Sequence, residues 1–277
     1  LDQSLFHQYL YFIRDLSHGD LGRALINEEP VRDIIQKALP ASIELGICSL
    51  FLAALIGITI GLSGISKEGS KLDFAGRLYG ISTYALPPFW AAMIVQLIFA
   101  VILGWLPVGG RFPPSLIEPQ GTGFFILDSL LNKNWVALQG AIRHLMLPTM
   151  TLGVLLSGIF SRSLRLNLSR TLEADHIQAA RSRGIKESQV ILNHALPNAL
   201  LPVLTIAGIT IASLIGGALL IEVTFSWPGI AMRLQEAISQ RDYPVVQGIV
   251  VVIASLVVLI SVIIDIIVAT IDPRVKY

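Results

Sequence analysis

Five long apolar runs dominate the sequence and decide what the chain can fold into. Each is close to the roughly twenty mostly apolar residues that an α-helix needs to cross a bilayer. Within lipid, backbone polar groups must be paired inside the protein, which restricts a spanning segment of this kind to a helix. The composition agrees, because 53% of the residues are hydrophobic and only 14% are charged. We therefore predict an all-α membrane protein with spans at 39–65, 78–104, 145–161, 199–221 and 248–271.

Proline and small residues within these runs predict how the helices bend and pack. Pro87 and Pro88 remove two backbone donors from the second run, so we expect a bend there. Small residues recur at every fourth position in two other runs, which lets helix backbones approach closely in lipid. They are Ala53, Gly57 and Gly61 in the first run and Gly208, Ala212 and Gly216 in the fourth.

The distribution of Lys and Arg predicts the orientation. Basic residues number 11 in 55 positions on one side of the predicted membrane and 9 in 104 on the other. The denser side is assigned to the cytoplasm by the positive-inside rule. The cytoplasmic segments are then 66–77, 162–198 and the tail 272–277, and the external segments are 1–38, 105–144 and 222–247.

This orientation raises a question about the start of the chain. Five spans and a cytoplasmic C-terminus put Leu1 outside, yet the sequence begins with Leu and carries no signal sequence that would export residues 1–38. We therefore expect a sixth helix upstream of Leu1. The transmembrane domain itself is predicted to cover 39–271.

Several kinds of function are disfavoured by what the sequence lacks. It contains no G-x-x-x-x-G-K-[ST] phosphate loop, so the chain itself is not expected to bind ATP in that way. Its single cysteine, Cys48, and its isolated histidines predict no metal, cofactor or catalytic site, and its scattered basic residues predict no nucleic-acid partner. An ion-coupled secondary transporter or a channel stays open as the alternative, although Glu44 and Asp265 lie near span ends rather than at mid-membrane. A membrane enzyme would need clustered titratable groups, and none is visible.

The segment 167–198, between the third and fourth runs, reads as two short helices with a corner at Gly184. Asp175 belongs to the first turn of the first helix, where a carboxylate favours the positive end of the dipole. Arg181 belongs to its last turn, and Gly184 suits a left-handed cap. The second helix is expected to begin near Glu187 and to bend at Pro197 into the next span.

The order of residues in this segment resembles the E-A-A-x3-G-x9-I-x-L-P coupling loop of ABC importer permeases. Ala, Ala, Gly, Leu and Pro are in register, whereas glutamine and histidine replace the acidic residue and the isoleucine. In that family the loop inserts a short helix into a cleft of a cytoplasmic ATPase. The resemblance thus implies an ATPase-coupling role for Gln178, Ala179, Ala180, Gly184, His194, Leu196 and Pro197.

Further stretches resemble the dipeptide, oligopeptide and nickel branch of that family, and specifically the first of its two permeases. They include 39–45 (L-P-A-S-I-E-L), 87–90 (P-P-F-W), 222–229 (E-V-T-F-S-W-P-G) and 241–248 (R-D-Y-P-V-V-Q-G). The resemblance implies a type I importer fold in a bacterial inner membrane. It also implies a second homologous permease, two ATPase subunits that hold ATP and Mg, and an external substrate-binding protein. The cargo would be a peptide, glutathione, a nickel chelate or another small solute.

Overall fold

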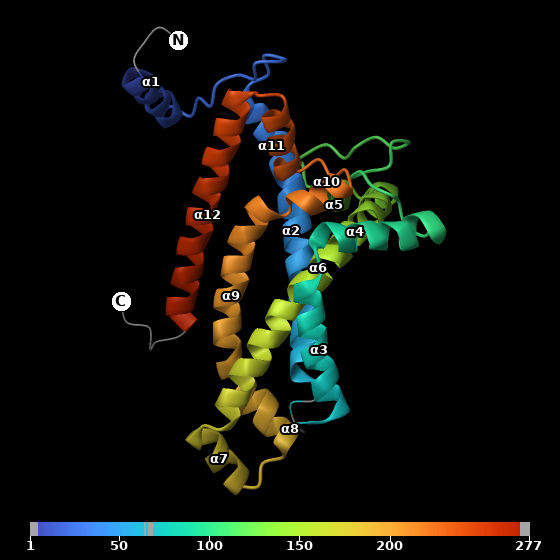
Figure 1. The fold of residues 1–277 in the computed structure, drawn as a ribbon, viewed down its shortest axis with the longest axis vertical. Helices are drawn as coiled ribbons and strands as arrows, with labels where there is room; N and C mark the ends of the chain where they lie inside the picture. Colours follow the sequence, from blue (N-terminus) through green and yellow to red (C-terminus); the bar gives the residue numbers. More distant parts are fainter. Residues whose placement is uncertain (1–4, 64, 66–68, 272–277) are drawn as a thin grey trace.

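The computed structural model describes residues 5–63, 65 and 69–271, and the described part is built from helices (Figure 1). Apart from one isolated bridge between Arg23 and Pro30, no β pairing occurs in that part of the chain. The elements in chain order are α1 (Leu5–Ser17), α2 (Val31–Leu62), α3 (Lys71–Ala85), α4 (Pro88–Gln96), η1 (Leu97–Ile102), α5 (Phe125–Leu131), α6 (Trp135–Leu172), α7 (Asp175–Ser182), α8 (Glu187–Gln189), η2 (Val190–Ala195), α9 (Leu196–Gly217), α10 (Leu219–Thr224), α11 (Ile230–Ser239) and α12 (Tyr243–Ile271).

Four helical stretches are long and apolar enough to cross a membrane, and a bent pair supplies a fifth. The stretches are Val31–Leu62, Trp135–Leu172, Glu187–Ile211 and Tyr243–Thr270. The bent pair is α3 with α4–η1, whose axes turn by 100°. An all-α membrane fold is therefore confirmed.

The second predicted run, 78–104, is not one continuous span. Leu86 leaves the helical conformation, Pro87 precedes α4 and Pro88 opens it, so the chain turns where the two prolines lie. Proline removes an amide donor and disfavours helical backbone in the residue before it, which explains a break rather than a gentle bend. In Figure 1, α4 runs almost sideways from the top of α3.

Other helix boundaries differ from the edges of the apolar runs. The third run, 145–161, lies inside the 38-residue α6, and the fourth run divides between α9 and α10. Outside this run, polar and charged residues interrupt the apolar sequence of α6 on both sides, because a helix that projects from a membrane does not need to be continuously apolar there. Hydropathy identifies only the most apolar part of such a helix, so the predicted run is shorter than α6.

The close approach of α2 and α6 depends on small residues. Ala53 is fully buried, and a Cβ at Gly57 would lie 2.5 Å from Phe160 Cβ and 2.7 Å from Ser157 O. The predicted face of Ala53, Gly57 and Gly61 therefore packs as expected. Gly208 is likewise held against Ile264 of α12. Ala212 and Gly216 lie outside the residues whose surroundings are described.

The segment after α9 is fixed against α2 by buried polar contacts. Trp227, which is 1% exposed, donates its indole N–H to Ala41 O at 2.9 Å. Ser42 donates to Glu222 Oε1 at 2.5 Å, and Met232 N donates to Glu222 Oε2 at 2.9 Å. Ala41 and Ser42, in one turn of α2, thus fix the segment between α10 and α11 in place.

The two ends of the bundle carry different segments of the chain. Figure 1 shows α7, α8 and the start of α3 at one end, and α1 and α11 at the other. Residues 66–68 and the predicted tail 272–277 lie outside the described residues. We call the first end the α7 end.

Candidate functional site

The segment between α6 and α9 forms a helix, a corner and a second helix at the α7 end. The first helix, α7, has Asp175 in its first turn and Arg181 in its last. Gly184 has φ +78° at the corner, in the left-handed region that glycine adopts without steric cost. Its amide donates to Arg181 O at 2.9 Å, as expected where a helix ends. The conformation predicted for Gly184 is therefore present.

The second helix continues into the membrane stretch without a loop. The three residues of α8 lead into the π-helical η2, and α9 follows directly at Leu196. Pro197 is the second residue of α9, which follows η2 directly. The expected bend at Pro197 stays a prediction, and the residue directly before Leu196–Pro197 ends a π-helical segment.

The seven predicted coupling residues differ in what they present to solvent. Gln178, Ala179, Gly184, His194 and Pro197 are exposed, and Leu196 is half-buried. Ala180 is only 6% exposed and packs with the fully buried Ile177 into a core shared with α6, η2 and α9. Ala179 is thus available to a partner surface, whereas Ala180 packs against residues of this chain. Its small side chain is needed within this chain.

An ion pair closes the corner. Arg181 donates from Nη2 to Glu187 Oε1 at 2.6 Å and from Nε to Glu187 Oε2 at 3.1 Å. Its Nη1 also donates to Leu172 O at 3.3 Å, at the end of α6. The hydrogen bond to Glu187 raises the pKa of Arg181 above its usual value, so the guanidinium stays charged. One side chain therefore ties α7 to α8 and to α6.

A second arginine joins three helices near the same end. Arg165 of α6 pairs with Asp73 of α3 and donates from Nη2 to Ile60 O and Ser63 O, each at 2.9 Å. Carbonyls at a helix C-terminus favour a cation, because the helix dipole makes that end negative. Any movement of α6 is consequently shared with α2 and α3.

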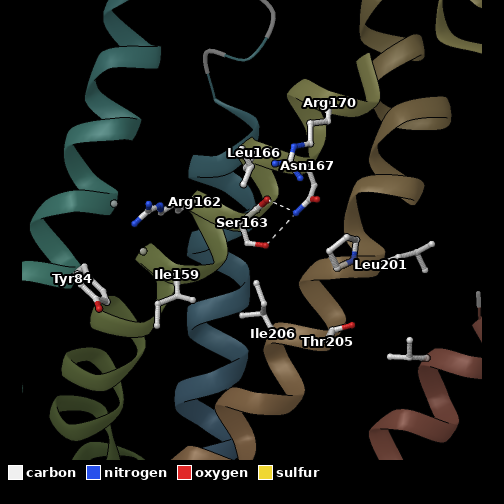
Figure 2. Close-up of a pocket in the computed structure, with 14 residues that line it drawn as sticks. Tyr84, Ile159, Arg162, Ser163, Leu166, Asn167, Arg170, Leu201, Thr205 and Ile206 are labelled. Carbon is white, nitrogen blue, oxygen red and sulfur yellow. Dashed lines mark hydrogen bonds between the residues drawn. The ribbon is translucent and has the colours of Figure 1, made fainter. Parts of the chain in front are cut away.

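A cavity of about 660 Å³ lies beside α6, between α3 and α9, with Val268 of α12 on its wall. Figure 2 shows Arg162, Ser163, Asn167 and Arg170 along the α6 side of it, with Tyr84 from α3. Thr205 faces it from α9. Asn167 Nδ2 donates to Ser163 O at 2.8 Å. The cavity therefore combines an apolar wall with a few polar groups, as small-molecule sites generally do.

The sequence profile of binding-protein-dependent transport system inner membrane components matches residues 53–277. The chain belongs to this family. Its members are transport permeases, so the fold described above is a transmembrane transport component.

Relatives with full-length similarity are named as peptide permeases. The di/tripeptide transport system permease protein DppB of Pseudomonas aeruginosa is 37% identical over 278 residues, covering 100% of this chain and 82% of that protein. The dipeptide transport system permease protein DppB of Alkalihalophilus pseudofirmus is 38% identical, with 100% and 83% covered. The oligopeptide transport system permease protein AppB of Bacillus subtilis is 35% identical, with 100% and 82% covered.

Solved structures of two importers share the fold. An inward-facing MetNI methionine ABC transporter chain superposes with a TM-score of 0.66 at 17% identity, covering 86% of this chain and 96% of that one. A chain of an amino acid ABC transporter gives 0.58 at 10% identity, with 95% and 98% covered. The type I importer fold expected from the sequence is therefore confirmed.

Proposed function

We propose that this chain is a permease subunit of an ABC importer that carries small peptides across a bacterial inner membrane. The observation that supports the cargo best is the full-length identity of 37–38% with proteins named as di/tripeptide and dipeptide permeases. The α7 end faces the cytoplasm in this proposal, and the C-terminus lies on the same side. A second homologous permease would complete the pathway, and an external binding protein would deliver the peptide.

Energy comes from two ATPase subunits, which hold ATP and Mg, and segment 167–198 transmits it. Gln178 and Ala179 are exposed on α7, so they are available to a cleft on an ATPase. Ile177 and Ala180 attach α7 to the core of its own chain. A force on α7 therefore reaches α6, which precedes it in sequence, and α9, because both helices contribute to that core.

Replacement of Ala179 by Glu tests this role without touching the core. Ala179 is exposed, so the free permease should fold normally, whereas a carboxylate at residue 179 would be desolvated in a tight interface. We expect ATPase pull-down to weaken at least about tenfold, which corresponds to about 1.4 kcal/mol. Peptide uptake should fall with it. Gln240→Glu is the matched control, because it adds the same charge at an exposed site at the other end of the bundle.

Two results would contradict the proposal. One is normal ATPase binding and normal uptake in the Ala179→Glu variant. The other is ATP hydrolysis by the purified chain alone, above that of a mock preparation, because the sequence contains no phosphate loop of its own.

A further inference from the structure

Four arginines line two neighbouring cavities on the sides of α6 toward the α7 end. The cavity of about 660 Å³ contains Arg162 and Arg170, and a second one of about 670 Å³ contains Arg77, Arg162 and Arg165. The two cavities also share Gly80, Tyr84 and Leu166. Arg162 therefore borders both.

The four arginines differ in how their charges are compensated. Arg77 and Arg165 both form ion pairs with Asp73. No carboxylate in the described part of the chain forms an ion pair with Arg162 or Arg170, and no Asp or Glu lines either cavity. The first cavity thus carries two uncompensated positive charges.

The position of Arg162 makes its charge notable. It precedes Leu172, the last residue of α6, by ten residues, or about 15 Å along the axis. Arg170 lies only two residues from that end. Arg162 therefore lies about 12 Å further from that end than Arg170, directly after the predicted span 145–161, and both side chains are exposed.

Neutral hydrogen-bonding groups accompany Arg162. Ser163, Asn167 and Thr205 line the same cavity, and the remaining wall is largely apolar (Figure 2). The planar guanidinium group matches a carboxylate with two parallel hydrogen bonds. A volume of about 660 Å³ lies within the range of about 300–1,000 Å³ that holds small organic ligands. Charge, shape and size therefore fit a small molecule that ends in a carboxylate.

We propose that Arg162 binds the C-terminal carboxylate of the peptide as it passes through this cavity, with Arg170 adding to the local positive potential. The proposal rests on the proposed peptide transport and adds a subsite to it. Removal of the guanidinium should then weaken interaction with peptides that carry a free carboxylate, while leaving peptide amides unaffected.

Charge-selective labelling measures the potential directly. Thr205 is exposed to the cavity, so a Thr205→Cys, Cys48→Ser permease is assembled with its partners in phosphatidylcholine vesicles. It is then treated with an anionic or a cationic methanethiosulfonate reagent. We expect the anionic reagent to be favoured, and Arg162→Gln to lower the anionic-to-cationic rate ratio roughly fivefold, about 1 kcal/mol. Arg233→Gln, at the other end of the bundle, should leave the ratio unchanged.

Protection then identifies the ligand. Millimolar alanyl-alanine should slow the labelling of residue 205, alanyl-alaninamide should not, and Arg162→Gln should abolish the difference. Equal protection by the two peptides, or an unchanged rate ratio in Arg162→Gln, would overturn the proposal. Protection that appears only when phosphatidylglycerol is added to the vesicles, and not with the peptide, would also overturn it and indicate a lipid headgroup site. The labelling needs no ATP turnover, so ATPase stimulation by the binding protein, measured in parallel, tests the proposed function separately.

Discussion

Arg111 donates from Nη2 to Glu44 Oε2 at 2.7 Å, although the two residues are 67 positions apart, and both are buried. The guanidinium also donates to Gly123 O at 2.7 Å and lies 3.9 Å from the centre of the Phe125 ring. The other Glu44 oxygen accepts from Ile126 N at 2.9 Å. The Glu44 carboxylate on α2 therefore binds the segment between η1 and α6 at two places, through Arg111 and through the amide of Ile126.

Loss of one member of this pair should destabilise the permease strongly. In Glu44→Gln the buried Arg111 keeps its charge without a counter-ion, a change that typically costs about 3–5 kcal/mol. We expect a clearly lower thermal denaturation midpoint for the purified, assembled transporter. The double variant Glu44→Gln, Arg111→Met removes both charges and should recover part of the loss. A single variant as stable as the parent would show that the pair contributes little.

The apolar runs were sufficient to predict the fold class, because lipid accepts few alternatives to a helix. At Pro87–Pro88 the sequence predicted the position of a bend but not its angle, which is 100°. Hydropathy measures how apolar a segment is and carries no information on the direction of the axis after a break. The apolar runs also missed the length of α6, since polar and charged residues interrupt the apolar sequence toward its ends.

The predicted corner is present at Gly184, because glycine at a helix end readily adopts the left-handed backbone conformation. The Arg181–Glu187 pair was missed, since the two residues belong to different helices and their spacing has no helical period. Ala180 shows a further limit. The motif predicted a coupling role for this residue, but the motif does not indicate which face of α7 is buried against the rest of the chain. Arg162 could not be predicted as a binding residue from the sequence. Only the fold shows that Arg165 pairs with Asp73, whereas Arg162 lines a cavity without a carboxylate partner among the residues that the structure describes.

The Arg181–Glu187 pair should affect coupling more than stability. Both side chains are partly exposed, so either single substitution to Gln should change stability by less than about 1 kcal/mol. Each should nonetheless loosen α7 relative to α8 and lower peptide uptake per complex. Because Arg181 also contacts Leu172 O, the charge swap Arg181→Glu, Glu187→Arg should restore uptake only in part. A double-mutant cycle on uptake and on thermal midpoints measures both effects; uptake that is unchanged in every variant would assign the pair no role in coupling.

Cysteine labelling tests the orientation. On a Cys48→Ser background, Gln120→Cys and Gln240→Cys should react with a membrane-impermeant maleimide in intact cells. Ser182→Cys, which is exposed at the α7 end, should react only after permeabilisation. The three sites are all exposed, so differences in reaction reflect the side of the membrane rather than burial. Labelling of Ser182→Cys from outside would reverse the orientation and remove the coupling role of α7.

Substitution of Gly184 separates backbone conformation from side-chain contact. A Cβ at this position would have no heavy atom within 4 Å, so a larger residue meets no steric barrier from its surroundings. What opposes it is φ +78°, which costs a residue with a side chain about 1–2 kcal/mol and is least favourable for β-branched residues. Gly184→Val should relieve this strain by rotating α7 away from its present direction. Gly184→Asn is the matched control, since asparagine tolerates the left-handed region.

We expect both variants to reach the membrane at normal levels, because Gly184 is exposed and lies outside the packed spans. The Val variant should show weaker ATPase pull-down and slower peptide uptake in the same cells, and the Asn variant should resemble the parent. Equal losses in the two variants would mean that the absence of a side chain matters at residue 184, as it would if the glycine itself touched the ATPase. Normal uptake in the Val variant would mean that the direction of α7 does not determine coupling, and the segment would then be only a connection between α6 and α9.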